Sequence, residues 1–251
     1  MKLHPVEVLS REEHGRHVLL RYRWTGVAPE PGQFVMARPA SHAGLDPFLP
    51  RPLFAHDHDG ETMSLLFEIR GRGTALLADE DAGLLVSAPL GRGFATRDGG
   101  LPVALVGGGV WVSPLKLLSR RLENEGVVHN VFLEVPADAP GAYAEFLRSR
   151  YGDADLVPTR GEGDAPRMML ERIGDLSRYA ALYASGTAEM LGAVRATADG
   201  VVSAQLALRE RMACANGSCY GCAVPVWEAG EKVYRRTCVE GPVFEAGSLA
   251  W

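Results

Sequence analysis

Apolar and polar residues alternate in short runs along residues 1–97 of the chain. The apolar positions are rich in branched and aromatic side chains, and proline and glycine separate the runs, which is the pattern of β-strands joined by turns. Strands are predicted at four places: His17–Tyr22, Phe34–Arg38, Thr62–Ile69 and Leu84–Ala88. Short strands at this spacing are typical of a small antiparallel β-barrel.

The pattern changes after residue 97. The stretch GLPVALVGGGVWVSPLKLLSRRLENEG predicts a buried strand, a glycine turn and an amphipathic helix. Ser113 is a favourable N-cap, Pro114 a favourable first helical residue and Gly126 a favourable helix end. Strands and helices then continue to alternate, with strands at Val127–Val135, Asp155–Pro158 and Ala180–Ala184 and a helix around Ala142–Arg150. Such alternation predicts a parallel sheet with helices on its faces.

These patterns divide the chain into three parts. Residues 1–97 are predicted to form the β-barrel, residues 98–203 an α/β domain with a parallel sheet, and residues 204–251 a small domain that carries all the cysteines. The expected fold class is therefore multidomain α+β. With 47% apolar and 23% charged residues, the composition is that of an ordinary globular protein.

Charge and hydropathy exclude two kinds of partner. The net charge of −5 argues against nucleic acid, because proteins that bind nucleic acids usually present a basic surface. No apolar run approaches the ~20 residues of a membrane-spanning helix, and the N-terminal MKLHPVEVLSREEHG lacks the apolar centre of a signal peptide. No membrane partner is expected, and a cytoplasmic enzyme or enzyme subunit is the prediction.

All four cysteines lie close together, in the spacing Cys214-x4-Cys219-x2-Cys222-x15-Cys238. Disulfides are disfavoured, because nothing marks the chain for secretion and cytosolic thiols stay reduced. A structural zinc site usually pairs two short C-x2-4-C segments, whereas three of these thiols share one loop. The x4, x2 spacing with a distant fourth cysteine is that of plant-type [2Fe–2S] proteins. Such a cluster is the prediction, with zinc as the alternative.

The residues between the first three cysteines suit a cluster. Ala215-Asn216-Gly217-Ser218 and Tyr220-Gly221 are mostly small, and their glycines permit the tight turns that point backbone N–H groups at sulfur. Hydrogen bonds and burial would then tune the reduction potential of the anionic cluster.

A lone arginine and a glycine turn in the barrel indicate a diphosphate site. Arg51, in PFLPRPLF, lies beside a proline and has a guanidinium that can bind two phosphate oxygens at once. In FEIRGRGTALLADE, a turn at Gly71 and Gly73 follows a strand. Thr74 then caps a helix predicted to start at Ala75, whose free N–H groups bind phosphate. Separately, these features are also typical of a surface arginine and an ordinary helix start; together they predict a two-sided clamp.

Two turns in the α/β domain predict a nucleotide site. Gly107-Gly108-Gly109 directly follows a buried strand and precedes a helix, and Ser185-Gly186 repeats this arrangement. Ligands of open α/β sheets bind beyond the carboxyl ends of the strands. The G-x-G-x-x-G fingerprint is absent, so a simple tight turn is the alternative.

The run His56-Asp57-His58-Asp59 contains residue types that bind metal ions. Gly60 follows it, and short polar runs before glycine usually form solvated turns. A turn is therefore predicted in preference to a metal site.

Motifs over nearly the whole chain resemble those of one known family. They are PGQFVM at 31–36, RPLF at 51–54, GRGT at 71–74, APLGRGF at 88–94, VGGG with SPL at 106–115, ERMACANGSCYGC at 210–222 and TCVEGPVF at 237–244. With these motifs the chain resembles the electron-transfer subunits of dihydroorotate dehydrogenase type B, which are ferredoxin-reductase-like flavoproteins. The Gly-Pro-Val-Phe that closes the last motif is the most specific feature.

The resemblance implies an electron relay. In this family a partner subunit oxidises dihydroorotate with FMN in pyrimidine biosynthesis, and electrons pass through a [2Fe–2S] cluster and FAD to NAD+. The resemblance implies a heterotetramer with that FMN-containing catalytic subunit, and no dihydroorotate pocket in this chain. The cluster ligands would be Cys214, Cys219, Cys222 and Cys238. FAD would contact Arg51, Pro52, Leu53, Phe54, Phe67, Glu68, Ile69, Gly73 and Thr74. The nicotinamide nucleotide would contact Gly107, Gly108, Gly109, Ser185 and Gly186.

Some positions depart from the family's pattern. Phe54 stands where a serine usually approaches the flavin, and Glu68 replaces an arginine. Trp111 replaces a glycine of the nucleotide loop, and Ser185-Gly186-Thr187 replaces Cys-Gly-Pro. The cysteines are unaffected, whereas the nicotinamide site is altered. The hypothesis that follows is weak binding of NAD, or a different electron acceptor.

Two other functions fit part of the sequence. A reductase subunit of another soluble complex, such as a sulfhydrogenase or a ferredoxin:NADP reductase, would share the domains and differ in its partner. A flavin- or zinc-binding regulatory module would carry no electrons. The apolar run Val224–Trp227 is either a docking surface for the partner or part of a small core.

Overall fold

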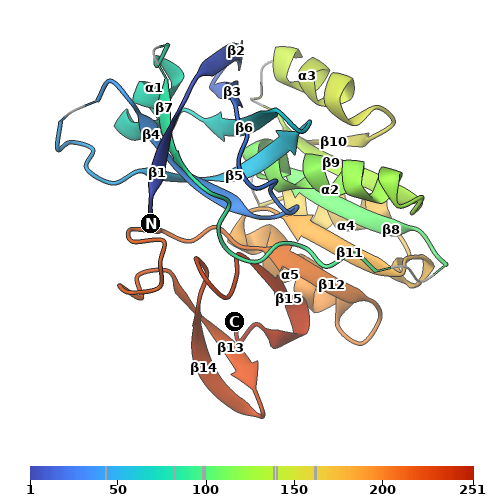
Figure 1. Ribbon diagram of the computed structural model, residues 1–251. Helices are drawn as coiled ribbons and strands as arrows, with labels where there is room; N and C mark the ends of the chain where they lie inside the picture. Colours follow the sequence, from blue (N-terminus) through green and yellow to red (C-terminus); the bar gives the residue numbers. More distant parts are fainter. Residues whose placement is uncertain (43, 82, 98–99, 138, 140, 161–162) are drawn as a thin grey trace.

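The computed structural model describes residues 1–42, 44–81, 83–97, 100–137, 139, 141–160 and 163–251. Within these ranges the chain forms an antiparallel sheet, a mixed sheet and a hairpin (Figure 1). The predicted fold class is confirmed, with one difference: an antiparallel strand joins the edge of the otherwise parallel sheet.

Seven strands in the described N-terminal part form the antiparallel sheet, in the order β1-β7-β4-β5-β6-β3-β2. Their bounds are β1 Leu3–Val6, β2 Val8–His14, β3 His17–Arg23, β4 Phe34–Pro39, β5 Arg51–His58, β6 Thr62–Glu68 and β7 Leu84–Ser87. The outermost strands, β1 and β2, are separated in the chain by Glu7 alone, so the sheet curves round into a barrel. The four predicted strands are confirmed to within one residue at each end, and β1, β2 and β5 were not predicted.

Strand β3 contributes to two cores. Val18 and Leu20 pack inside the barrel, whereas Leu19 packs on the outside, against the core beneath helices of the second sheet. This explains why HVLLRY lacks the alternation of a half-exposed strand. The barrel and the mixed sheet are thus joined through a continuous apolar contact.

The mixed sheet carries helices on both faces (Figure 1). Its parallel strands run in the order β10-β9-β8-β11-β12, with bounds β8 Val103–Gly108, β9 His129–Pro136, β10 Asp155–Thr159, β11 Ala181–Ser185 and β12 Ser203–Ala207. Val103 and Leu105 of β8 face one core, and Ala104 and Val106 face the other. The first core is covered by α2 (Ser113–Asn124) and α3 (Gly141–Tyr151), the second by α4 (Ala165–Ile173) and α5 (Ala188–Ala198).

Two boundaries predicted here are wrong by a short distance. Ser113 is the first residue of α2 and not its N-cap, because a 3-10 turn at Gly109–Val112 runs directly into the helix and makes Val112 the cap. The strand predicted to start at Val127 starts at His129.

The C-terminal part adds a hairpin to the fold and one more strand to the mixed sheet. β13 (Ala223–Glu228) and β14 (Glu231–Arg236) form the hairpin, and β15 (Val243–Glu245) pairs antiparallel with β12. β12 crosses the predicted boundary between residues 203 and 204, so the cysteine-bearing segment is attached to the mixed sheet at both of its ends. Of the helices in the described ranges, none is both long and apolar enough to cross a bilayer.

Candidate functional site

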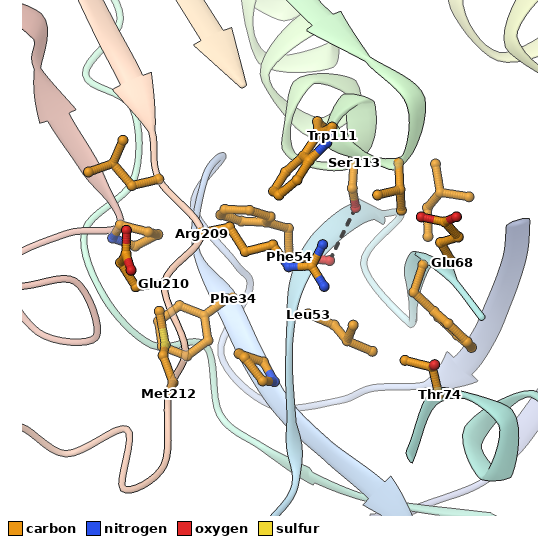
Figure 2. Close-up of a pocket in the computed structure, with 16 residues that line it drawn as sticks. Phe34, Leu53, Phe54, Glu68, Thr74, Trp111, Ser113, Arg209, Glu210 and Met212 are labelled. Carbon is orange, nitrogen blue, oxygen red and sulfur yellow. Dashed lines mark hydrogen bonds between the residues drawn. The ribbon is translucent and has the colours of Figure 1, made fainter. Parts of the chain in front are cut away.

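A mostly apolar cavity, the aromatic pocket, opens where the barrel meets the glycine loop of the mixed sheet and the segment before the cysteines (Figure 2). The barrel and α1 (Arg72–Ala78) supply one side: Phe34, Pro52, Leu53, Phe54, Leu66, Phe67, Glu68 and Thr74. The other side comes from Val110, Trp111, Ser113, Leu208, Arg209, Glu210, Met212 and Pro242. Apolar walls with a few polar groups are typical of sites for aromatic cofactors.

The predicted diphosphate clamp has a defined geometry at the rim of this pocket. A Cβ atom on Gly73 would lie 2.0 Å from Nε of Arg51, so the guanidinium lies directly against the bare backbone of the glycine. Across the described part of the chain, no hydrogen bond or ion pair engages the Arg51 side chain. An unpaired guanidinium beside an accessible backbone is suited to binding phosphate oxygens.

Thr74 and Ile69 lie differently from their predicted places. α1 starts at Arg72 with Gly71 as its N-cap, so Thr74 is the third helical residue and not the cap of a helix that starts at Ala75. Its Oγ1 accepts a hydrogen bond from the N–H of Arg70 at 3.0 Å. Ile69 packs against the barrel core and does not line the pocket.

A second cavity, the glycine-loop cleft, has a volume of about 620 Å³ and lies between the barrel and the carboxyl edge of the mixed sheet. The parallel strand order reverses between β8 and β11, which is the place where open α/β sheets bind nucleotides. Gly108, Gly109 and Thr187 line the cleft. The cleft is also lined by charged and polar side chains from both domains, among them Arg16, His17, Arg70, Glu134 and Arg160.

The other residues predicted to contact a nucleotide lie behind the cleft. A Cβ on Gly107 would lie 2.7 Å from Cδ1 of Leu115, so this glycine permits close packing of α2 on the sheet. Ser185 is fully buried, and Gly186 packs against Met190 at the start of α5. The structure therefore brings two of these five predicted residues to the surface of the cleft.

The cysteines range from buried to exposed. Cys222 and Cys238 are buried, Cys214 is half-buried and Cys219 is exposed. In the loop, the N–H of Cys219 donates to Sγ of Cys214 at 3.4 Å, and the N–H of Gly221 donates to Sγ of Cys219 at 3.5 Å. Backbone N–H groups of Asn216 and Cys219 lower the pKa of Cys214 to about 6, so they favour its thiolate.

The surroundings of Cys238 disfavour its thiolate. Burial, with the thiol of Cys222 beside it, raises the pKa of Cys238 to about 12. Metal binding deprotonates such thiols. Among the described side chains, no three of His, Cys, Asp or Glu converge on one point that would hold a single ion. Four cysteine thiolates are the donor set of a [2Fe–2S] cluster, so Cys214, Cys219, Cys222 and Cys238 would hold it.

The core beneath the cysteines adjoins the aromatic pocket. Phe34 of β4 packs with Cys222 and Cys238, and Met212 packs against the same core. Phe34 and Met212 also line the aromatic pocket. Sequence reasoning gave neither residue a role, although both lie within the motifs PGQFVM and ERMACANGSCYGC.

Comparisons with known proteins identify the family of the chain. Residues 209–250 match the model of the iron-sulfur cluster binding domain of dihydroorotate dehydrogenase B. The dihydroorotate dehydrogenase B (NAD(+)) electron transfer subunit of Caldanaerobacter subterraneus subsp. tengcongensis is 32% identical over 237 residues, 90% of each chain. That of Geobacillus thermodenitrificans is 38% identical over 231 residues, 88% of this chain and 86% of the relative.

The chain belongs to the family of dihydroorotate dehydrogenase B electron transfer subunits. The resemblance seen in its motifs is confirmed. The same fold occurs in an NADH-dependent reduced ferredoxin-NADP oxidoreductase, with a TM-score of 0.75 and 21% identity over 98% of this chain and 90% of the other. It also occurs in phthalate dioxygenase reductase, with a TM-score of 0.62 and 15% identity over 90% of this chain and 87% of the other.

Glu68, one of the residues that depart from the pattern of this family, is paired with two arginines. The buried Glu68 carboxylate pairs with Nη2 of Arg16 at 3.2 Å and with Nε of Arg70 at 2.5 Å. It lines both the aromatic pocket and the glycine-loop cleft. The expected added negative charge is therefore offset by two guanidinium groups.

A second departure from the family pattern, Trp111, stands between the two cavities, since it lines both of them. Cζ of Arg209 lies 4.9 Å from its ring centroid, a cation–π contact (Figure 2). Two tyrosines of α3 hold the 3-10 turn that carries the indole: the hydroxyls of Tyr143 and Tyr151 donate to the carbonyls of Gly109 and Val112, each at 2.7 Å. The indole is thus fixed at the passage between pocket and cleft.

Two remaining predictions from the sequence have mixed outcomes. The run from His56 to Asp59 is not simply a solvated turn: His56 is buried, and β5 extends through His58 before the turn begins.

In the apolar run before the hairpin turn, Val224 and Val226 pack into the core beneath α4 and α5, while Trp227 is exposed. The prediction that this run is part of a small core is confirmed for Val224 and Val226.

Proposed function

We propose that this chain is the electron-transfer subunit of a cytoplasmic dihydroorotate dehydrogenase B that works in pyrimidine biosynthesis. It receives electrons from the FMN of a catalytic partner subunit, with which it forms a heterotetramer, and delivers them to NAD+ or another acceptor. FAD and a [2Fe–2S] cluster supply the electron chemistry when bound, because a flavin exchanges electrons in pairs with nicotinamide and singly with a cluster.

One observation carries this proposal: two side chains are common to the aromatic pocket and to the core beneath the cysteines. Phe34 and Met212 line the pocket, and they pack with Cys222 and Cys238. A ligand in the pocket is therefore separated from a ligand on the cysteines by a single layer of side chains.

Each group has residues that would hold it. Cys214, Cys219, Cys222 and Cys238 would bind the cluster. The diphosphate of FAD would bind Arg51, Gly73 and Thr74, and its ring system would lie among Pro52, Leu53, Phe54, Phe67 and Glu68, with Ile69 supporting the strand end. The nicotinamide nucleotide would bind Gly108 and Gly109, with Gly107, Ser185 and Gly186 shaping the loops from behind.

The proposal assigns one group to each part of the chain. Residues 1–97 bind FAD, residues 98–203 bind the nicotinamide nucleotide, and residues 204–251 bind the cluster. β12 and β15 attach the third part to the sheet of the second, which fixes the cysteines relative to the aromatic pocket.

The test is to purify the tagged full chain anaerobically from its own cells, identify the proteins that accompany it, and add dihydroorotate. The proposal predicts an FMN-containing partner and loss of visible flavin absorbance on addition of dihydroorotate, only when that partner is present. A different oxidoreductase as partner, with no response to dihydroorotate, would support a reductase subunit of another complex and overturn the proposal.

A further inference from the structure

The glycine-loop cleft extends along the carboxyl edge of the mixed sheet, from the aromatic pocket to the outermost parallel strand. Trp111 and Arg160 both line the cleft; Trp111 also lines the aromatic pocket, whereas Arg160 directly follows β10 at the edge of the sheet. Only β9 lies between β10 and β8, and neighbouring strands are about 4.8 Å apart, so the ends of β10 and β8 are roughly 10 Å apart. The cleft can therefore hold an extended ligand whose middle lies at the glycine loop.

Four of the five arginine and glutamate side chains described in the lining of this cleft have partners. The carboxylate of Glu68 forms ion pairs with Arg16 and Arg70. Oε1 of Glu134 accepts a hydrogen bond from Oγ1 of Thr159 at 2.8 Å. In each case the partner also lines the cleft, so these groups hold its walls together.

Arg160 is the fifth of these charged side chains. It is exposed, and across the described part of the chain no hydrogen bond or ion pair engages its guanidinium. A guanidinium presents N–H donors in a planar fork that matches two oxygens of one phosphate group. Because Arg160 lies just beyond the carboxyl end of a parallel strand, where open α/β sheets bind nucleotides, its charge favours an anionic group at this end of the ligand.

Glu134 lies elsewhere in the cleft and does not offset this charge. In dinucleotide-binding sheets an acidic side chain about 20 residues beyond the glycine loop binds the ribose 2′-hydroxyl of NAD, whereas an arginine accommodates the 2′-phosphate of NADP. Oε2 of Glu134 lies against the glycine loop, since a Cβ on Gly108 would be 2.2 Å from it, and Oε1 is bound by Thr159. The carboxylate is thus held between β8 and β10, which leaves Arg160 at the far end of the cleft.

We propose that the glycine-loop cleft prefers a nicotinamide nucleotide with a phosphate on its adenosine ribose, NADP(H) over NAD(H), and that Arg160 determines this specificity. The inference rests on the proposed function, in which residues 98–203 bind the nicotinamide nucleotide. The nicotinamide end is directed toward Trp111, the diphosphate lies at the glycine loop, and the adenosine end lies at Arg160. A 2′-phosphate accepts two N–H groups of the guanidinium there, whereas a 2′-hydroxyl leaves the cation to water.

The test is calorimetric titration of the full, cofactor-loaded chain with adenosine 2′,5′-bisphosphate and with adenosine 5′-monophosphate, which differ only in the 2′-phosphate. The bisphosphate is expected to bind about 10- to 100-fold more tightly, the usual effect of hydrogen bonds between charged groups. Arg160→Gln should abolish this difference and leave the affinity for the monophosphate unchanged. Arg148→Gln should retain the difference, because Arg148 is an exposed arginine of the same domain that does not line the cleft.

A second measurement needs no variant: the dissociation constants of NADP+ and NAD+ for the oxidised wild-type chain, which do not depend on turnover. The proposal predicts tighter binding of NADP+ by a similar factor. Binding of NAD+ at least as tight as that of NADP+, or equal binding of the two adenosine probes, would overturn the role of Arg160 while the proposed function stands. If none of the four nucleotides binds, both this specificity and the assignment of residues 98–203 to a nicotinamide nucleotide are wrong.

Discussion

At position 73 the absence of a methyl group decides where an arginine can lie. Gly73→Ala would place Cβ 2.0 Å from Nε of Arg51 and displace the guanidinium from the clamp. We expect FAD to bind about tenfold or more weakly, because charge-assisted hydrogen bonds to the diphosphate are lost. The measurement is the dissociation constant of FAD for the cofactor-stripped and reconstituted chain.

Gly71→Ala is the control for this substitution. Gly71 has extended backbone angles, and a Cβ there would meet nothing within 4 Å. The Gly71→Ala variant should bind FAD with the affinity of the wild type. If both variants bind FAD as the wild type does, the clamp is misassigned.

Trp111 should limit access of nicotinamide to the aromatic pocket. The indole lies between the pocket and the cleft and is held by a cation–π contact with Arg209, which is typically worth ~0.5–2 kcal/mol. Trp111→Ala removes this contact, so NADH should bind roughly 2- to 30-fold more tightly to the FAD-loaded chain. Trp227→Ala, at an exposed tryptophan of the hairpin, should leave the binding constant unchanged. Equal or weaker NADH binding by Trp111→Ala would show that the indole is no barrier.

The buried His56 predicts a pH dependence of stability. Its pKa is about 3 in the folded chain against 6.5 in the unfolded chain, so the unfolded state binds more protons below pH 6.5 and stability falls as pH falls. From pH 7.5 to pH 5.5 this group should remove about 1.4 kcal/mol from the free energy of unfolding.

Urea unfolding at the two pH values, in buffer without phosphate, measures this loss. His56→Gln should reduce the drop by that amount, whereas His4→Gln should not change it. An identical drop in the wild type and in His56→Gln would mean that His56 is not buried as a neutral ring.

At the residue scale, chemistry could be predicted where spacing alone specifies it. The four cysteines could be predicted as cluster ligands because their spacing is typical of plant-type [2Fe–2S] proteins. Phe34 and Arg209 could not be identified, because their importance depends on which distant segments fold against them. The buried state of His56 was missed for the same reason: α2 and α3, more than fifty residues later, cover it.

At the scale of elements, the cysteine loop depends on its left-handed turns. Gly217 has φ +83°, and a Cβ there would lie 3.0 Å from Nη1 of Arg236. Gly217→Ala is expected to destabilise the loop by roughly 1–2 kcal/mol from its backbone alone and to lower the iron content of the purified chain. Gly221→Ala should keep its iron, because a Cβ at Gly221 would make only an ordinary contact of 3.6 Å with Sγ of Cys219. Equal iron content in the two variants would contradict the claim that the loop depends on the left-handed turn at Gly217.

Elements with a clear hydrophobic period could be predicted, and those without one could not. β3, β4, β6 and β7 have buried apolar residues, and all were found. β2 is mostly polar and largely exposed, so its sequence VLSREEH carries no such pattern. β5 contains Pro52 and ends in the polar residues 56–58, because it borders two cavities instead of one continuous core.

At the scale of the whole molecule, strand β5 borders two cavities. Pro52, Leu53 and Phe54 line the aromatic pocket, and His56 to His58 line a smaller polar cavity on the side of α2 and α3. Arg51, at the start of the strand, lies against the bare backbone of Gly73. The order of the domains could be predicted from composition and periodicity. The attachment of the cysteine segment to the mixed sheet through β15 could not, because a strand of three residues has too short a pattern to detect.

The central claim is that one chain holds an iron–sulfur cluster beside a flavin. Analysis of iron, acid-labile sulfide, zinc and flavin in the anaerobically purified full chain tests it most directly. The account predicts two irons, two sulfides and one FAD per chain, without zinc. Zinc in place of iron, or a chain that contains no flavin and takes up none on reconstitution, would contradict it.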